Sequence, residues 1–185
     1  MGSMVTRIQG FCGRMGPMKA RIVMVGLDGV GKTTILYQMK LNKTMSTTPS
    51  IGHRVETLDP ISLVSFTLWD VSVGAKGWPL IRHFLPDSHG LVFVVDSTDS
   101  ERFGEVKENL FCLVFEDTDN LPLIVLANMQ DIEGAHSPAD IARYLELEKI
   151  KHRRWEICGC CGTDGNGLLE AFEKLSSMVK DWKQV

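Results

Sequence analysis

The sequence predicts an α/β fold: a mostly parallel six-stranded sheet with helices on both faces and one antiparallel edge strand. Short apolar runs rich in β-branched residues alternate along the chain with helical patterns of about ten to fifteen residues. This alternation is typical of parallel sheets, because a parallel connection needs a crossover helix. A length of 185 residues with 44% hydrophobic content suits one domain with a substantial core.

The first half of the chain supplies three of the expected strands. An apolar run closed by Gly26 predicts a strand that is buried on both faces, and a helix follows it. Two further strands are expected to form a hairpin that turns at Asp59-Pro60, and this hairpin provides the antiparallel edge strand. The expected elements are strand 20–25, helix 32–40, strand 53–58 and strand 62–69.

The second half repeats a strand followed by a helix three times. The expected elements are strand 91–95, helix 102–116, strand 121–127, helix 138–145, strand 154–158 and helix 168–179. The apolar runs 90–95 and 121–127 are far shorter than the roughly 20 residues that a membrane-spanning helix needs. In sheets of this kind ligands bind beyond the carboxyl ends of the strands, so the chemistry is expected there.

Charge and cysteine content limit the classes of function. A formal net charge of −3 gives no field that would attract a polyanion, so we expect no nucleic-acid partner. The five cysteines are an odd set with no secretory signal ahead of them, which indicates free thiols in a reducing compartment. We therefore expect a cytoplasmic, monomeric protein.

A phosphate-binding loop is predicted between the first strand and the first helix. Residues 26–33 read GLDGVGKT and match G-x-x-x-x-G-K-[ST] in full. Backbone N–H groups would surround the β-phosphate, Lys32 would bridge the β- and γ-phosphates, and Thr33 would bind Mg²⁺. The alternative is a glycine-rich turn with a chance lysine, which the full match disfavours. The residues expected here are Asp28, Gly29, Val30, Gly31, Lys32, Thr33 and Thr34.

A site for the base is expected at the ends of two later strands. Asn128-Met129-Gln130-Asp131 follows an expected strand, and the Asp131 carboxylate can accept bonds from N1–H and N2–H₂ of guanine. Adenine would leave this carboxylate unpaired, so the residue favours GTP or GDP as the ligand. The alternative is an ordinary Asn/Asp turn. Backbone N–H groups near Cys161, Gly162 and Thr163 are placed to meet the base oxygen.

With these residues in place, the chain resembles the Arf/Arf-like (ADP-ribosylation factor) family of small GTPases in the Ras superfamily. The resemblance runs from Lys19 nearly to the end of the chain, as a G domain over residues 19–185. It rests on Gly26-Leu27-Asp28, Pro49-Ser50-Ile51-Gly52, Val55-Glu56-Thr57, Trp69-Asp70-Val71, Pro79-Leu80, Arg82-His83 and Val94-Val95-Asp96-Ser97.

The resemblance implies further ligands and partners. Ser50 stands where the family has a switch-one threonine that joins the Mg²⁺ shell, and Asp70 stands where an aspartate orients a magnesium-bound water. Effectors, exchange factors and GTPase-activating proteins would bind the switch regions. The function implied is a molecular switch or docking module in membrane or vesicle trafficking.

The second switch departs from the family pattern. Where the family has two glycines and a glutamine after the aspartate, this chain has Ser72, Val73 and Gly74. Val73 replaces the glycine whose N–H meets the γ-phosphate, and Gly74 replaces the catalytic glutamine that orients the attacking water. Because phosphoryl transfer depends on positioning, we expect very slow intrinsic hydrolysis. The alternatives are an enzyme completed by a partner and a nucleotide-independent scaffold.

Met129 is a second departure, at the position of a lysine whose stem covers the base. A methionine can still pack on the ring, but it offers no ammonium group to the phosphate loop. The substitution predicts weaker nucleotide retention and faster exchange than is usual in the family.

Residues 1–18 predict a separate amphipathic segment. Met1 to Thr6 fit the pattern M-G-x-x-x-[ST], which makes Gly2 a site for myristoylation. Val5, Ile8 and Cys12 recur at helical spacing, which favours peripheral contact with a Golgi, endosomal or plasma membrane. The alternative is that residues 1–3 are foreign to the chain and the rest packs on the core.

A cluster of thiols near the end of the last strand invites a metal-binding interpretation. Cys158, Cys160 and Cys161 lie within four residues of one another, but tetrahedral zinc needs a further Cys or His pair at suitable spacing. Buried thiols in a core strand explain the cluster better.

Overall fold

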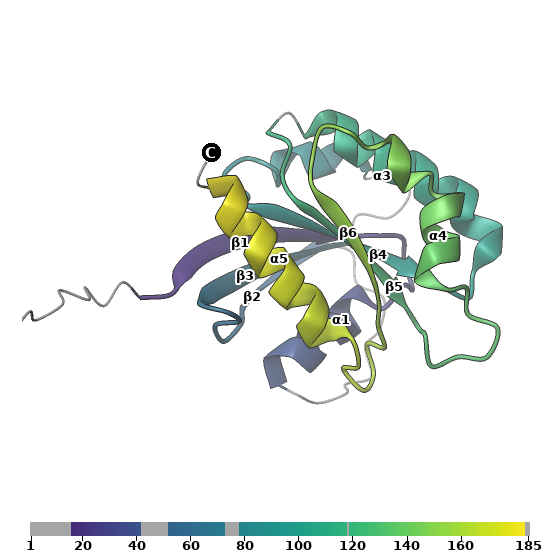
Figure 1. Ribbon diagram of the computed structural model, residues 1–185, viewed down its shortest axis with the longest axis horizontal. Helices are drawn as coiled ribbons and strands as arrows, with labels where there is room; N and C mark the ends of the chain where they lie inside the picture. Colours follow the sequence, from purple (N-terminus) through teal and green to yellow (C-terminus); the bar gives the residue numbers. More distant parts are fainter. Residues whose placement is uncertain (1–15, 42–51, 73–77, 118, 184–185) are drawn as a thin grey trace, which may run out of the picture.

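The computed structural model describes residues 16–41, 52–72, 78–117 and 119–183. In this part of the chain six strands form one sheet in the order β2-β3-β1-β4-β5-β6 (Figure 1). The edge strand β2 is antiparallel to β3, and every other neighbouring pair is parallel. The strands are β1 (Met18–Val25), β2 (Gly52–Thr57), β3 (Val64–Ser72), β4 (Gly90–Asp96), β5 (Leu123–Asn128) and β6 (Trp155–Gly159). The predicted fold class is confirmed.

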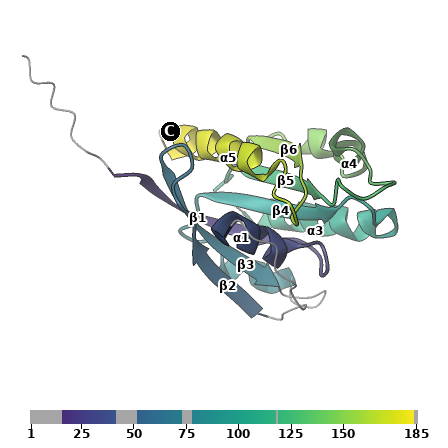
Figure 2. The same ribbon diagram turned by 90° about the horizontal axis from the view of Figure 1, so that it is seen from below.

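Helices cover both faces of the sheet (Figures 1 and 2). The α-helices α1 and α5 lie in contact on one face, and α3 and α4 lie on the other. The helices are α1 (Lys32–Leu41), α3 (Phe103–Glu116), α4 (Pro138–Tyr144) and α5 (Leu168–Lys183), with 3-10 turns η1 (Trp78–His83), η2 (Ser100–Arg102) and η3 (Leu147–Lys149). None of these described helices combines the length and the apolar character that crossing a membrane requires.

Local signals explain where two of the helices begin. Ser137 accepts a hydrogen bond from the N–H of Asp140 at 3.2 Å, and Pro138 occupies the first turn, so α4 starts with a capped end. Asp99 caps the turn η2 by accepting a bond from the N–H of Arg102, and α3 follows directly. The helices predicted at 102–116 and 138–145 are confirmed to within a few residues.

The hairpin between β2 and β3 turns later than predicted. Ser62 and Leu63 have φ angles of 47° and 66°, and Ile61 and Val64 exchange backbone hydrogen bonds of 2.9 Å around them. Two successive residues with positive φ match the right-handed twist of a hairpin. The predicted turn at Asp59-Pro60 is therefore wrong, because the two residues lie ahead of the tight turn.

The core fills both sides of the central strands. Every residue of β5 is buried, as are all but the last residue of β4, because helices cover each face. Register then places polar residues together at the carboxyl ends. Asp70 of β3 pairs with Met24 of β1, and Asn128 of β5 pairs with Asp96 of β4. The carboxyl ends of these strands lie at one edge of the sheet.

Candidate functional site

The loop between β1 and α1 has a backbone that only glycine can adopt at two points. Gly31 has a φ of +88°, and a Cβ atom there would lie 2.5 Å from Nδ2 of Asn128. Gly26 has a φ of +152°, and a Cβ atom there would lie 2.4 Å from the carbonyl oxygen of Val94. The loop therefore curls tightly against β4 and β5.

Lys32 folds back over this loop from the first turn of α1. Its side chain is buried, and Nζ donates hydrogen bonds of 2.9 Å to the Gly26 carbonyl and 2.7 Å to the Leu27 carbonyl. Burial lowers the pKa of Lys32, while the Asp70 and Asp28 carboxylates act in the opposite direction. Among the described residues its hydrogen-bond partners are these two neutral carbonyls, and a buried ammonium group in such a setting is well suited to bind an anion.

Thr33 and Asp70 meet beside the lysine. The Thr33 hydroxyl donates a 2.7 Å hydrogen bond to Oδ2 of Asp70, whose side chain is 2% exposed. The second carboxylate oxygen, Oδ1, is buried with no hydrogen-bond partner in the described structure. Such an oxygen is costly unless a cation or its water satisfies it. A hydroxyl and a carboxylate are ligands that Mg²⁺ prefers, so these two residues fit the ion.

Asn128 joins the phosphate loop to the loop after β6. Its Nδ2 donates to the Val30 carbonyl at 2.8 Å, and its Oδ1 accepts from the N–H of Gly162 at 2.8 Å. The Cys160 thiol also approaches Oδ1 at 3.7 Å. Asn128 is 2% exposed, so one buried carboxamide bonds two loops that follow different strands. This geometry supports Asn128 as a brace of the phosphate loop.

The loops after β5 and β6 also meet near Asp131. Met129 adopts a φ of +66°, which is unusual for a residue with a side chain, and Asp131 is exposed. Burial raises the pKa of the Cys161 thiol, and a hydrogen bond involving Asp131 raises it further. The Cys161 thiol also lies 3.0 Å from the hydroxyl of Thr163. The residues predicted to bind a base thus come from two loops to one place.

Gln130 and Arg102 make contacts near the site that sequence patterns did not predict. Gln130 Nε2 donates to the Ser97 hydroxyl at 2.8 Å and to the His136 carbonyl at 2.9 Å, which supports the loop after β5. Arg102 of η2 reaches Asp28 in the phosphate loop. Gln130 lies within the run Asn128 to Asp131 but was given no role there, and the Arg102 contact joins residues far apart in the chain.

The remaining predicted residues are distributed as follows. Val30 is buried, Asp28, Gly29 and Thr163 are exposed, and Thr34 lies in the first turn of α1. Four predicted positions lie outside the described residues: Gly2, Ser50, Val73 and Gly74. Within the described ranges, no three His, Cys, Asp or Glu side chains are grouped to hold a metal ion, and Cys158, Cys160 and Cys161 are free thiols.

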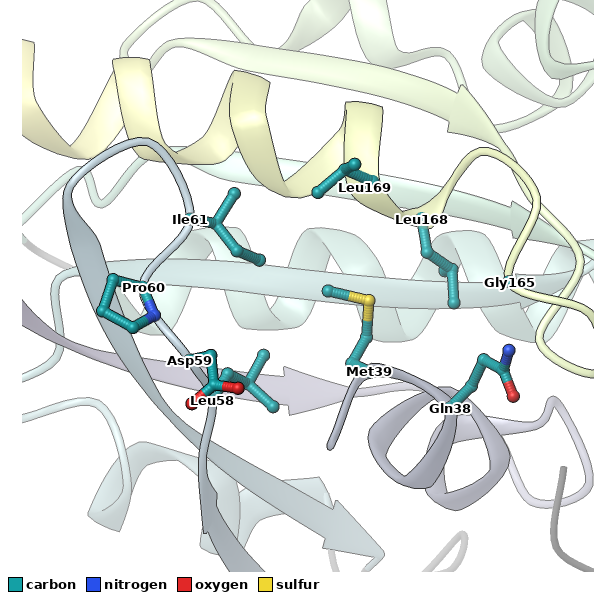
Figure 3. A pocket seen from close by; sticks show the side chains of 9 residues that line it. All are labelled: Gln38, Met39, Leu58, Asp59, Pro60, Ile61, Gly165, Leu168 and Leu169. Atoms are coloured by element: carbon teal, nitrogen blue, oxygen red, sulfur yellow. The ribbon is translucent and has the colours of Figure 1, made fainter. Parts of the chain in front are cut away.

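A pocket of about 250 Å³ lies outside the predicted nucleotide site (Figure 3). Its walls come from the end of α1, the segment that joins β2 to β3, the loop before α5 and the start of α5. None of the residues predicted to bind nucleotide lines it. The lining residues are Gln38, Met39, Leu58, Asp59, Pro60, Ile61, Gly165, Leu168 and Leu169.

The fold and the loops at its carboxyl edge define a Ras-like small GTPase domain with a phosphate-binding loop. The chain belongs to the ADP-ribosylation factor (Arf) family, whose sequence model matches residues 8–179. A similar solved structure is the Arl6 BBS3 small GTPase from Trypanosoma brucei with the bound nucleotide analogue GppNp. It is 29% identical, with a TM-score of 0.81, and the match covers 89% of this chain and 99% of that chain. The predicted family is confirmed.

Proposed function

We propose that this chain is a switch or docking module controlled by GTP and GDP with Mg²⁺. The observation that carries the proposal is the side chain of Asn128, three residues before Asp131, which bonds the phosphate loop at Val30 and the loop after β6 at Gly162. A polyanion-binding loop and a carboxylate suited to guanine thereby become parts of one site. Lys32 would hold the terminal phosphates, and Thr33 with Asp70 would hold Mg²⁺, which supplies charge neutralisation on the phosphates.

Binding of purified protein to nucleotides tests this proposal directly. We expect GDP and GTP to bind with Mg²⁺ and ADP and ATP to bind far more weakly, because Asp131 would face adenine unpaired. Lys32→Ala should abolish tight binding. Asp131→Asn should shift preference from guanine to xanthine nucleotides, since the amide can donate to the 2-oxo group of xanthine.

A lysine outside the proposed site serves as the control for Lys32→Ala. Lys151→Ala, at an exposed position before β6, is the matched control for the loss of a lysine. Native protein that carries no nucleotide, and binds none with Mg²⁺, would contradict the proposal. That result would favour the alternative of a nucleotide-independent scaffold.

The proposal includes impaired hydrolysis, because Gly74 occupies the position of the water-positioning glutamine. Single-turnover release of γ-phosphate should be very slow and should rise in Gly74→Gln. A partner that donates an arginine can supply roughly 10³ to 10⁵ in rate, so the assay is repeated with cell extract. Release from the unaltered chain at the rate of an ordinary Arf protein would contradict this part of the proposal.

A group of partly exposed aromatic side chains would supply a surface for effectors. The Trp69 ring stacks on His53 with centroids 5.6 Å apart, and the Arg21 guanidinium lies 4.2 Å from the Trp69 ring centroid. Phe84 completes the group at 5.6 Å from His53. Large aromatic groups beside a cation are frequent anchors in protein interfaces. Their place on β2, β3 and the segment after η1 borders the regions predicted to respond to nucleotide.

The proposal also includes a trafficking role at a membrane. The N–H of Met18 bonds the Leu63 carbonyl at 2.9 Å, so β1 begins beside the hairpin turn. Leu63 is 77% exposed, and Leu169, which lines the pocket, is 59% exposed. By family resemblance the amino-terminal segment would pack on the core with GDP and leave for lipid with GTP. Sedimentation with liposomes, with and without residues 1–15, tests this role.

A further inference from the structure

An arginine from the loop after β4 reaches the rim of the phosphate loop. Nη1 of Arg102 lies 3.4 Å from Oδ1 of Asp28 and 3.3 Å from the Asp28 carbonyl oxygen. Nε of the same guanidinium donates to Oδ2 of Asp99, and the Asp99 side chain also caps η2. The Arg102 side chain is 34% exposed. It is thus held on its own turn while one end extends to a loop 74 residues away in sequence.

Asp28 places a negative charge in the loop that would receive phosphate. A loop that receives phosphate is normally surrounded by donors and positive charge, yet Asp28 contributes a carboxylate that is 80% exposed. Its charge acts on Lys32, because the Asp28 carboxylate is among the groups that raise the pKa of that ammonium against the effect of burial. Asp28 therefore lies within electrostatic reach of the cation that would hold the terminal phosphates.

A negative charge there affects GTP more than GDP. Like charges repel in proportion to their product, and the γ-phosphate adds negative charge to the nucleotide. The same carboxylate also competes with phosphate for the Lys32 ammonium. Without compensation, Asp28 would lower affinity for the triphosphate relative to the diphosphate.

We propose that Arg102 is a positioning residue that draws the Asp28 carboxylate away from Lys32 and so sets the relative affinity for GTP and GDP. The inference rests on the proposed guanine-nucleotide function and names a regulator within that site. Arg102 acts through Asp28. Its guanidinium is already engaged by Asp99, which orients it toward the loop.

The test compares dissociation constants for GDP and for a non-hydrolysable GTP analogue. An exposed ion pair contributes up to about 1 kcal/mol, so Arg102→Gln should weaken the analogue up to about fivefold more than GDP. Arg102→Lys should keep most of the ratio, because the charge remains. Arg102→Gln combined with Asp28→Asn should restore it, because the uncompensated charge is gone. Raising the salt concentration should shrink the effect of Arg102→Gln.

Arg143→Gln is the matched control. Arg143 forms the same kind of pair, three residues from Asp140 on α4, with Nη1 and Oδ1 3.0 Å apart and a 76% exposed side chain. It should leave both constants unchanged.

Equal weakening of both nucleotides in Arg102→Gln, without rescue by Asp28→Asn, would overturn the inference and indicate a purely structural arginine. An unchanged ratio would also overturn it. Failure of the unaltered chain to bind either nucleotide would overturn the proposed function and this inference with it.

Discussion

A single carboxamide, that of Asn128, satisfies buried backbone groups in two different loops. Asn128→Ala would leave the Val30 carbonyl and the Gly162 N–H without these bonds. A buried polar group left unpaired costs about 1–3 kcal/mol, so GDP affinity should fall about tenfold or more. Stopped-flow release of a fluorescent GDP analogue measures this effect.

The control for this residue is Asn109→Ala, on α3. Asn109 is half-buried and belongs to none of the loops that Asn128 joins. GDP release should be unaltered in this variant. Unchanged release in Asn128→Ala would mean that the loops keep their places without the carboxamide.

Met129 offers a test in the direction of tighter binding. Its backbone is already in the left-handed conformation, and the side chain is half-buried. Met129→Lys keeps the unbranched stem and adds a cation that can bond the phosphate loop, so slower GDP release and higher affinity are expected. Isothermal titration measures the change. If Met129→Lys leaves the affinity for GDP and the affinity for GTP unchanged, the ammonium group contributes nothing to binding here.

Residues within continuous motifs were predictable because their chemistry depends on neighbours in sequence. Lys32 and Thr33 follow from the spacing of the glycine-rich loop, and Asn128 follows from its position after a strand. Arg102 had no such signal, because its contact with Asp28 depends on how η2 lies against the phosphate loop. Gln130 was missed for the same reason, since its partners Ser97 and His136 come from separate turns.

At the scale of elements, a buried ion pair ties the end of α3 to the segment before β6. The side chains of Arg153 and Asp117 are 1% and 2% exposed and form a direct salt bridge. Arg153 also donates to the carbonyls of Val114 and Leu121. Arg153→Met would leave the buried Asp117 carboxylate without its cation, which should lower the free energy of unfolding by about 3–5 kcal/mol.

The adjacent arginine provides the comparison. Arg154 pairs with Asp181, but the two side chains are 53% and 61% exposed, so Arg154→Met should change stability by less than about 1 kcal/mol. Urea denaturation followed by circular dichroism measures both variants. Similar midpoints for the two would show that the buried pair contributes no more than the exposed one.

Element type was easier to predict than element boundary. The apolar runs that became β4 and β5 are buried on both faces, so composition alone indicated strands. The hairpin turn was misplaced because Asp59-Pro60 is a strong sequence signal for a turn. Ser62 and Leu63 adopt positive φ although neither is a glycine, so the sequence did not indicate the turn there. The short 3-10 turns were not predicted, because three to six residues carry no periodicity.

At the scale of the whole molecule, the site joins loops that follow different strands of the sheet. The loops after β1, β5 and β6 and the carboxyl end of β3 converge through Lys32, Asp70, Asn128 and Gly162. Sequence predicted this convergence from the parallel strand order, since carboxyl ends of parallel strands share one edge. It could not predict that one oxygen of Asp70 is buried without a partner, because that depends on side-chain geometry.

This convergence predicts that nucleotide binding stabilises the entire fold. A ligand that binds only the folded state adds about 2.7 kcal/mol to the free energy of unfolding when its concentration is about one hundred times its dissociation constant. For a domain of this size, that should raise the Tm by about 5–10 °C. GDP with Mg²⁺ should give this shift, and chelation with EDTA should reduce it, because the buried Asp70 oxygen loses the ion that would satisfy it. Differential scanning calorimetry measures each step. ADP with Mg²⁺ is the control, and an equal shift with ADP would contradict selection of guanine by Asp131.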